Sequence, residues 1–376
     1  MAAIALAILI PLALVVPRQA ARAAPQARSI PALSLKGFAN ARVPWRFVFP
    51  RDHGAHVQFA SEWWYYTGHL RAADGRQFGY ELTFFRYGLA PGDPAPRAGE
   101  SRWRGNQVFP VHLALTDEAG RRFVYDSRFA REALGMGRAA VGQLNVHVGD
   151  WWLRGDGPFR MRAQSAAVGL DLEQIEEKPP AVHGHDGVSL KAACDTCASH
   201  YYSMTRLRTS GWLSYRGERV RVEGISWMDH EFGSGELQAD QAGWDWFSVQ
   251  LDDRREIMDY RLREKNGSIT PESSGSLVDA RGAVRYLPLG AVVVDATGSW
   301  TSPHTHGVYP SGWRMRVPSA GLDLTLVPVL RDQELANTAG GVSYWEGAVD
   351  VRDTASGKHR GVGYVELTGY AGAISL

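Results

Sequence analysis

The sequence lacks three features that would each point to a class of protein. It has no basic excess, because 41 basic and 40 acidic residues leave a net charge of +1, whereas nucleic-acid-binding proteins usually carry a surplus of Lys and Arg. It has no glycine loop for phosphate, since Gly135-Met-Gly137 is not followed by a nucleotide-binding helix. It has no convincing serine nucleophile, since Gly224-Ile-Ser226 lacks the second glycine and lies in a β region. These absences argue against nucleic-acid and nucleotide binding and leave a secreted hydrolase as a distant alternative.

The chain also has no apolar run long enough for a comfortable membrane-spanning helix. Residues 2–16 are apolar but short, and Ala21-Arg22-Ala23 has the small-x-small pattern of a signal-peptidase site. We therefore predict that residues 1–23 are a signal peptide and that the protein is exported, either periplasmic or secreted. An uncleaved N-terminal anchor is the alternative. No cysteine follows the cleavage site, which argues against a lipoprotein.

Cysteine is scarce, with only Cys194 and Cys197 in the chain. In an exported protein a local disulfide is the expected state of such a pair, with free thiols as the alternative. Cys194, Cys197 and His200 also have the spacing of a partial metal site, but no fourth ligand is evident. We predict neither a metal nor a cofactor.

Aromatic residues and glycine are abundant, and both suit β-strands and tight turns. The chain has 13 Trp, 14 Tyr, 13 Phe and 41 Gly. Residues 62–70 and 77–86 read as an aromatic hairpin around the turn Ala73-Asp-Gly75, and only Arg128–Leu134 suggests a helical turn. Further strands are predicted at 108–116, 121–125, 143–152, 159–166, 169–176, 201–209 and 212–222. This pattern of many short strands predicts an all-β barrel or sandwich.

The second half of the chain repeats this pattern. Residues 243–251 and 256–263 form a second aromatic hairpin that ends, like the first, in an aromatic-Arg step. Later strands are predicted at 283–288, 291–296, 312–317, 322–328, 344–351 and 358–370. The weak internal similarity favours two tandem barrels, with a single large sandwich as the alternative. We assign residues 24–44 to a leader, 45–236 to an N-terminal domain and 237–376 to a C-terminal domain, and expect a loop at 173–187 where a lid could sit.

Two polar and aromatic motifs are the candidates for a chemical site. They are His200-Tyr-Tyr202 and, further along the chain, Trp227-Met-Asp-His-Glu-Phe-Gly233. Because strand residues alternate between faces, Trp227 and Asp229 should share one side, and so should His200 and Tyr202. If both pairs face one cavity, an acid, a base and aromatic walls meet there.

The chain resembles the AttH/carotenoid 1,2-hydratase family of lipocalin-like proteins, often described as predicted secreted hydrolases. The resemblance covers about residues 45–370 and implies two tandem lipocalin-like (calycin-type) antiparallel β-barrel domains. The matching segments are Phe49-Pro-Arg-Asp-His-Gly54, Glu62-Trp-Trp-Tyr65, Phe78-Gly-Tyr-Glu-Leu-Thr-Phe-Phe-Arg86, Ala198-Ser-His-Tyr-Tyr-Ser203, Trp227-Met-Asp-His-Glu-Phe-Gly233, Tyr344-Trp-Glu-Gly347 and Gly363-Tyr-Val-Glu-Leu-Thr-Gly369.

The catalytic pattern of the carotenoid hydratases is a His-x-Trp followed downstream by Tyr-x-Asp. His200 and Asp229 match its His and Asp, whereas Tyr202 and Trp227 exchange its two aromatic residues. The resemblance thus implies Asp229 as a general acid whose pKa is raised by burial and His200 as the base, with His230 as an alternative base. Tyr202, Trp227, Trp244 and Trp246 would line the substrate site and stabilise a cation.

These residues support two main hypotheses for function. The first is an exported hydro-lyase that adds water to a double bond of an isoprenoid, carotenoid-like or other lipid molecule. The second is a non-catalytic carrier of a hydrophobic ligand, associated with a membrane transporter. A structural hydrogen-bond network around Asp229-His230-Glu231 is the alternative to a chemical site.

Overall fold

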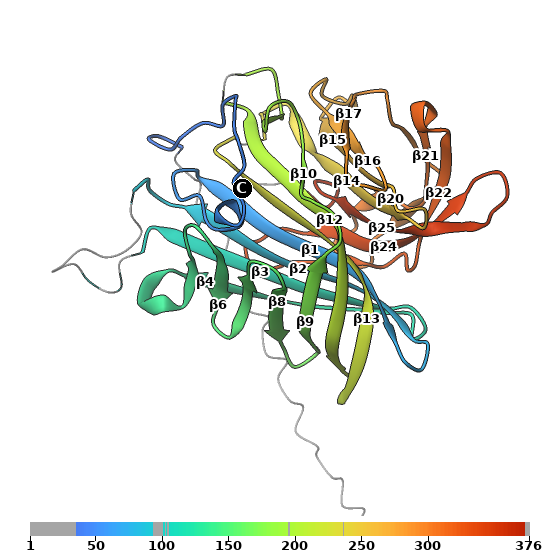
Figure 1. Cartoon of the computed structure of the whole chain (residues 1–376), viewed down its shortest axis with the longest axis horizontal. Coiled ribbons are helices and arrows are strands. Elements are labelled where there is room, and N and C mark those ends of the chain that lie inside the picture. Colours follow the sequence, from blue (N-terminus) through green and yellow to red (C-terminus); the bar gives the residue numbers. More distant parts are fainter. Residues whose placement is uncertain are drawn as a thin grey trace, which may run out of the picture.

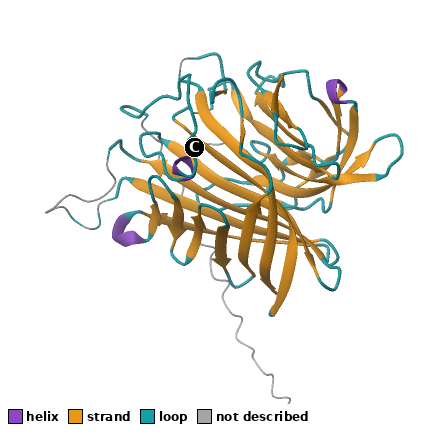
Figure 2. Ribbon diagram, viewed as in Figure 1, coloured by secondary structure: helices purple, strands orange, loops and turns teal. Residues whose placement is uncertain are grey.

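The computed structural model describes residues 35–92, 101, 103, 105–194, 196–235 and 237–372. These residues are almost entirely β-structure (Figure 2), interrupted by three single 3-10 turns, η1 (Arg51–His53), η2 (Ala133–Gly135) and η3 (Pro318–Ala320). The predicted signal peptide and its cleavage site lie outside the described residues. The described part of the chain includes no helix with the length and apolar character that crossing a bilayer requires.

The first sheet contains the strands up to Gly233 and curls into a nearly closed antiparallel barrel. Its main path runs in the order β4-β3-β2-β1-β13-β12-β9-β8-β7-β6-β5, and at its two ends β5 packs against β3, and β6 against β4. The strands are β1 (Ser61–Ala72), β2 (Gln77–Gly88), β3 (Gln107–Asp117), β4 (Arg122–Arg131), β5 (Gly137–Ala139), β6 (Leu144–Val148), β7 (Trp151–Gly155), β8 (Phe159–Gln164), β9 (Val168–Glu176), β10 (Ala181–Val182), β11 (Ser189–Leu190), β12 (Ala198–Tyr215) and β13 (Glu218–Gly233).

The second sheet begins at Gln241 and is curled but open, and it lies beside the first sheet in Figure 1. Its path runs β17-β16-β15-β14-β25-β24-β22-β21-β18, with β23 paired to β24. The strands are β14 (Gln241–Leu251), β15 (Glu256–Glu264), β16 (Ser274–Val278), β17 (Val284–Pro288), β18 (Val293–Ala296), β21 (Trp313–Val317), β22 (Leu322–Pro328), β23 (Glu334–Leu335), β24 (Tyr344–Asp353) and β25 (His359–Leu367), with β19 (Ser299–Thr301) and β20 (Val308–Pro310) as a separate ribbon.

The predicted all-β class and the tandem barrel-like arrangement are confirmed, and both predicted aromatic hairpins form, as β1–β2 and β14–β15. Several local predictions were wrong, and the strand expected at 143–152 is one of them, because a turn at Gly149-Asp150 divides it into β6 and β7. The predicted helical turn at Arg128–Leu134 lies mostly in β4, whose pairing with β3 supplies the backbone hydrogen bonds that a helix would otherwise make. The predicted break between strands 201–209 and 212–222 does not exist, because β12 continues to Tyr215 and the turn follows at Arg216-Gly217.

The barrel interior is a packed core. Alternate residues of β1, including Trp64, Tyr66 and Leu70, point inward and are buried, and they meet inward-facing residues such as Tyr202 and Met228 of β12 and β13. Large rings at alternate positions of these strands fill the barrel, as in small barrels generally.

The outer face of β1 and β2 packs directly against the second sheet. A Cβ atom on Gly79 would lie 2.7 Å from both Ala348 Cβ and Tyr364 Oη, so only glycine permits this approach. The segment after β9, expected as a lid, instead ties the two units together: Lys178 is buried and its Nζ lies 2.5 Å from Glu256 Oε2 of β15. The second sheet therefore covers one face of the barrel wall.

Candidate active site

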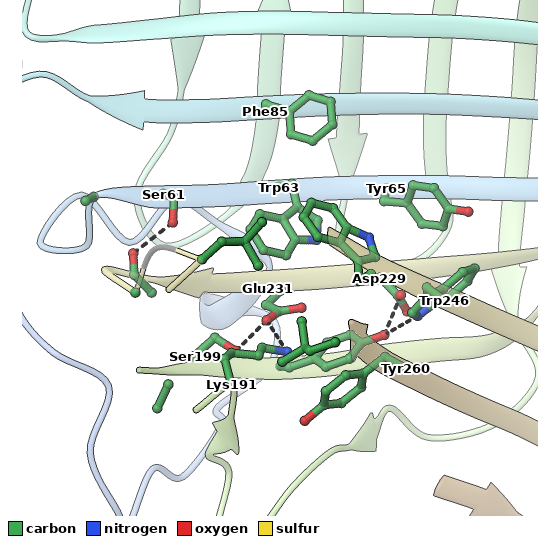
Figure 3. Close-up of a pocket in the computed structure, with 18 of the residues that line it drawn as sticks. Ser61, Trp63, Tyr65, Phe85, Lys191, Ser199, Asp229, Glu231, Trp246 and Tyr260 are labelled. Carbon is green, nitrogen blue, oxygen red and sulfur yellow. Dashed lines mark hydrogen bonds and ion pairs between the residues drawn. The ribbon is translucent and has the colours of Figure 1, made fainter. Parts of the chain in front are cut away.

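A cavity of about 150 Å³ lies between the outer face of the barrel and the second sheet (Figure 3). Tyr65, Tyr201 and Asp229 in its lining are buried, whereas Leu35, Ser61, Phe85 and Leu237 are among its partly exposed residues. Eight of its 22 lining residues are aromatic. The rings are those of Trp63, Tyr65, Phe85, Tyr87, Tyr201, Trp244, Trp246 and Tyr260, and the charged or acidic groups are Lys191, Asp229, Glu231 and Glu366.

Asp229 is the acid in the inner wall of the cavity. It lies on β13, is 4% exposed, and accepts hydrogen bonds from Tyr201 Oη (2.5 Å), Trp227 Nε1 (2.6 Å) and Ser203 Oγ. Burial raises the pKa of its carboxyl to about 7, although the three donors act in the opposite direction. At neutral pH Asp229 therefore exists in comparable amounts as the acid and the carboxylate.

Tyr201 connects Asp229 to the second sheet. Its hydroxyl donates to Asp229 Oδ2 and accepts a hydrogen bond from Trp246 Nε1 at 3.0 Å. The Trp246 ring also stands edge-on to the rings of Tyr65 and Trp227. The acid is thus held by residues from β12, β13 and β14 together.

A second hydrogen-bond chain reaches Asp229 from behind. Ser203 Oγ bonds to Asp229 Oδ1 and lies 2.6 Å from His183 Nε2, and His183 Nδ1 lies 2.9 Å from Ser276 Oγ of β16. Burial lowers the pKa of His183 to about 3, so its imidazole is neutral at physiological pH. A neutral imidazole donates at one nitrogen and accepts at the other. Ser203 can therefore donate to Asp229 when Asp229 is a carboxylate, and accept from Asp229 when Asp229 is protonated.

An ion pair forms another side of the cavity. Lys191 Nζ lies 2.7 Å from Glu231 Oε1, which also accepts from Ser199 Oγ. The ammonium group stands over the Tyr260 ring, 4.2 Å from its centroid, in cation–π geometry. Lys191 is fixed by the loop that Cys194 and Cys197 close with a disulfide, because its backbone N–H donates to Cys197 O. The predicted disulfide is confirmed.

The second sheet contributes a carboxyl group to the cavity, that of Glu366 on β25. Glu366 is partly buried and accepts a hydrogen bond from Trp244 Nε1 at 2.8 Å. It is paired across β24–β25 with Glu346, so both carboxyls lie on one face. Burial, together with the nearby charges of Asp229 and Glu231, raises the pKa of Glu366 to about 7. Burial also raises the pKa of Glu346 and that of Glu81, which lies opposite on β2.

The predicted site residues divide into two groups on opposite faces of the barrel wall. Asp229, Trp244 and Trp246 line the cavity, and Trp227 contacts Asp229 directly. Their roles remain predictions. The residues on the other face are His200, Tyr202 and His230, which point into the barrel.

The expectation that His200 and Asp229 share one cavity was wrong, because a β-bulge changes the register. Between the β12–β13 turn and the bulge, the strands pair in a register in which Leu207 lies opposite Ser226. If this register continued, Asp229 would lie opposite Met204, on the same face as Tyr202 and His200. The bulge between Met204 and Leu207 places two residues of β12 opposite one of β13, so Asp229 pairs with Ser203 instead. A one-residue shift moves side chains to the other face.

His200, Tyr202 and His230 serve the barrel interior. His200 stacks on Trp45 at 4.2 Å between ring centroids, and its Nδ1 lies 2.9 Å from Gly187 O. Tyr202 Oη lies 2.7 Å from His53 Nδ1 and 3.1 Å from His230 Nδ1. These contacts hold the segment before β1 against the inside of the barrel.

His230 also belongs to a buried group that has metal-ligand character. His56 Nδ1, Glu62 Oε1 and His230 Nε2 lie within 4.8 Å of one another, and two imidazoles with a carboxylate are a donor set that zinc accepts. However, Arg86 Nε lies 2.7 Å from Glu62 Oε2. Burial alone would raise the pKa of Glu62, but the charge of Arg86 and the two imidazole hydrogen bonds outweigh it and hold that pKa well below its usual range. The group is charge-compensated without an ion.

Several cavity residues were missed by sequence reasoning. Tyr201 and Ser203 alternate with the residues singled out in the same motif, so the signal was present but assigned to the wrong face. His183, Lys191 and Glu366 come from a loop region and a distant strand, and only the tertiary structure places them here.

The chain matches the model of the AttH-like family over residues 40–370. It is 33% identical to a solved structure from Nitrosomonas europaea assigned to AttH, with 89% of this chain and 100% of that chain covered and a TM-score of 0.78. No curated protein matches it by sequence.

Two more distant structures share the fold. Kievitone hydratase from Nectria haematococca is 14% identical, with 91% of this chain and 98% of that chain covered and a TM-score of 0.66. CghA, solved with Sch210972, is 13% identical with the same coverage and a TM-score of 0.52. The family match over most of its length and the closely similar Nitrosomonas structure show that the chain belongs to the AttH-like family.

Proposed function

We propose that this protein is a hydro-lyase that adds water to, or removes it from, an apolar molecule bound between its two sheets. The observation that carries the proposal is Asp229, a buried carboxyl with a pKa of about 7 in the wall of an aromatic cavity. A carboxylic acid can protonate an alkene only if it keeps its proton near neutral pH, and burial in apolar surroundings has this effect. The shared fold of kievitone hydratase is consistent with such chemistry.

In the proposed hydration, Asp229 gives its proton to one alkene carbon. The π electrons form the new C–H bond, and the neighbouring carbon becomes cationic. A water molecule then forms the C–O bond and loses a proton to Glu366, which lines the same cavity and is partly open to solvent. Proton exchange between the two carboxyls restores Asp229. The reaction consumes one water and yields an alcohol, and dehydration follows the same steps in reverse.

The two carboxyls suit this exchange because each has a pKa of about 7. Like charges in one site disfavour double ionisation, so the state that carries a single proton is favoured near neutral pH. The rings of Trp63, Trp244 and Trp246 line the cavity where the cation would form. Each ring face could stabilise a desolvated cation by about 1–2 kcal/mol.

We propose an isoprenoid, carotenoid-like or other lipid-like alkene as the substrate. A cavity of about 150 Å³ holds a group about the size of benzene, so a long substrate would insert one end and leave the rest outside the mouth. The CghA structure holds a small molecule, which supports ligand binding in this fold. Export to the periplasm or beyond, predicted from residues 1–23, is part of the same proposal.

The test is incorporation of labelled water. Purified protein is incubated with a panel of uncharged alkenes that carry a terminal dimethyl group, in water labelled with heavy oxygen, and products are analysed by mass spectrometry. The wild type should form a labelled alcohol, and Asp229→Asn should lose at least about a hundredfold in rate. Asp259→Asn is the matched control, since Asp259 is buried with a pKa also raised to about 7 but lies outside the cavity. Equal activity of both variants would refute the role of Asp229.

A carrier without catalysis is the second candidate, because the apolar cavity alone would bind a hydrophobic ligand. In that case extraction of the purified protein returns an unmodified apolar compound, and its recovery is the same from Asp229→Asn. Association with a membrane transporter would then supply or remove the ligand.

A further inference from the structure

We propose that the cavity selects apolar organic cations, such as alkylammonium groups, over uncharged molecules of the same shape, and that it rejects carboxylates and phosphates. This inference rests on the proposed function, because a bound organic cation would resemble the carbocation that forms when the alkene is protonated. The binding itself does not depend on turnover.

The balance of charge around the cavity favours a cation. Its lining contains three acids, Asp229, Glu231 and Glu366, and one base, Lys191. Lys191 is already compensated by Glu231 at 2.7 Å. Asp229 and Glu366 are held by neutral donors instead, namely Tyr201, Trp227 and Ser203 for the first and Trp244 for the second. An added cation would therefore meet two carboxyls that have no cationic partner among the described residues.

The protein already builds the proposed arrangement once in the same cavity. The ammonium group of Lys191 lies against a carboxylate, Glu231, and over the faces of Tyr260 and Tyr201, at 4.2 and 5.4 Å from their centroids. Glu366 and Asp229 share the cavity lining with Trp63, Trp244 and Trp246, which is the same combination of carboxyls and rings. Aromatic rings combined with acids are the usual receptor for ammonium groups.

Two buried carboxyl oxygens behind the cavity wall have no hydrogen-bond partner. Glu346 is fully buried, and one of its oxygens accepts from Tyr65, whose ring lines the cavity, while its Oε2 has no hydrogen-bond partner. Glu81 on β2 likewise has a buried Oε2 without a partner. A cation in the cavity would interact favourably with the lone pairs of these two oxygens, whereas an anion would face the three acids of the lining and a single lysine that is already paired.

The binding should strengthen as the pH rises. The titratable groups around the cavity are Asp229 and Glu231 on β13, Glu366 and Glu346 on β25 and β24, Glu81 and Tyr87 on β2, Tyr65 on β1, Tyr201 on β12, Tyr260 on β15, and Lys191. Asp229 and Glu366, the two lining carboxyls that form no ion pair among the described residues, each have a pKa of about 7. A permanent cation binds the ionised form more tightly, so it should displace protons from them.

The test uses three soluble probes of nearly the same shape: choline, dimethylbutanol (in which carbon replaces the nitrogen) and dimethylbutanoate. Calorimetric titration of the folded protein should show choline binding about tenfold or more tightly than the alcohol, with the acid weakest. Raising the pH from about 6 to about 8 should strengthen choline binding alone.

Glu366→Gln should reduce the preference for choline, and Asp259→Asn should leave it unchanged. Equal affinity for choline and the alcohol, tighter binding of the acid, or no binding of any probe would each overturn the proposal. The pH dependence of choline binding is measured on the wild type, so the test does not depend on the folding of a variant. A choline preference without hydration activity would refute the proposed reaction and leave this inference standing. Hydration activity without a choline preference would refute this inference and leave the proposed reaction standing.

Discussion

Replacing Asp229 with Asn should make the protein more stable at neutral and alkaline pH while removing its activity. In the unfolded chain an aspartate ionises near its ordinary pKa of 3.8, whereas in the folded protein burial raises this pKa to about 7. Between these values the folded state binds more protons than the unfolded state, so stability falls as the pH rises. This loss of stability is absent below the pKa of Asp229 in the unfolded chain and complete above its pKa in the folded protein.

The size of the effect follows from the two pKa values. Their difference corresponds to about 4 kcal/mol of stability that the wild type loses between about pH 4 and pH 7. Asn does not ionise and so avoids this loss. The amide NH2 of Asn must however face a donor, either Tyr201 at the position of Oδ2 or Trp227 and Ser203 at the position of Oδ1, which costs about 1–3 kcal/mol at every pH. The variant should thus be less stable than the wild type in acid and more stable above about pH 7.

The measurement is urea unfolding of both proteins at several pH values from about 4 to about 8. Taking the difference between the two removes the contributions of the other carboxyls with raised pKa values, such as Glu81 and Glu346. Asp259→Asn reports what a buried carboxyl outside the cavity contributes. A difference that stays constant with pH, or that moves against the variant as the pH rises, would refute the idea that Asp229 is kept from ionising.

Three further predictions address the surroundings of the site. Ser203→Ala removes a donor to Asp229, which should raise the pKa of Asp229 and move the alkaline limb of the rate profile up by about one pH unit or more; an unchanged profile would show that the bond does not influence the acid. Gly79→Val should lower stability by about 2–3 kcal/mol in urea unfolding and weaken choline binding, because its side chain would force Ala348 and Tyr364 away from the barrel; retained stability would contradict the close packing of the sheets. Chelators or added zinc should leave the melting temperature unchanged, because Arg86 and the imidazole protons already compensate Glu62; a rise with zinc would show that His56, Glu62 and His230 bind the ion.

The fold was largely predictable because its signals are local. Aromatic, strand-forming segments flank Ala73-Asp-Gly75 and the turn after Leu251, and a short turn between two such segments favours an antiparallel pair. The error at Arg128–Leu134 has the opposite origin, since those residues have no strong periodicity of their own and are drawn into β4 by pairing with β3.

The site was predicted in part, and the reason lies in one bulge. Asp229, Trp227, Trp244 and Trp246 were expected at the site, and three of them line the cavity while the fourth contacts the acid. The bulge opposite Trp227 places His200 and Asp229 on opposite faces of the barrel wall, whereas regular pairing would place them on the same face. Neither Thr205 nor Arg206 is a residue type that marks a bulge, so alternation alone could not reveal the change of face.

The arrangement also explains why the acid requires both halves of the chain. Asp229 and Tyr201 are on the outer face of the barrel wall, where a barrel standing alone would expose them to water. It is the second sheet, through Trp246 and the strands behind it, that covers them. Because burial is the main cause of the raised pKa of Asp229, the second sheet acts on the chemistry of a residue that the first sheet supplies. The barrel holds the carboxyl in place, and the covering sheet keeps its proton on it.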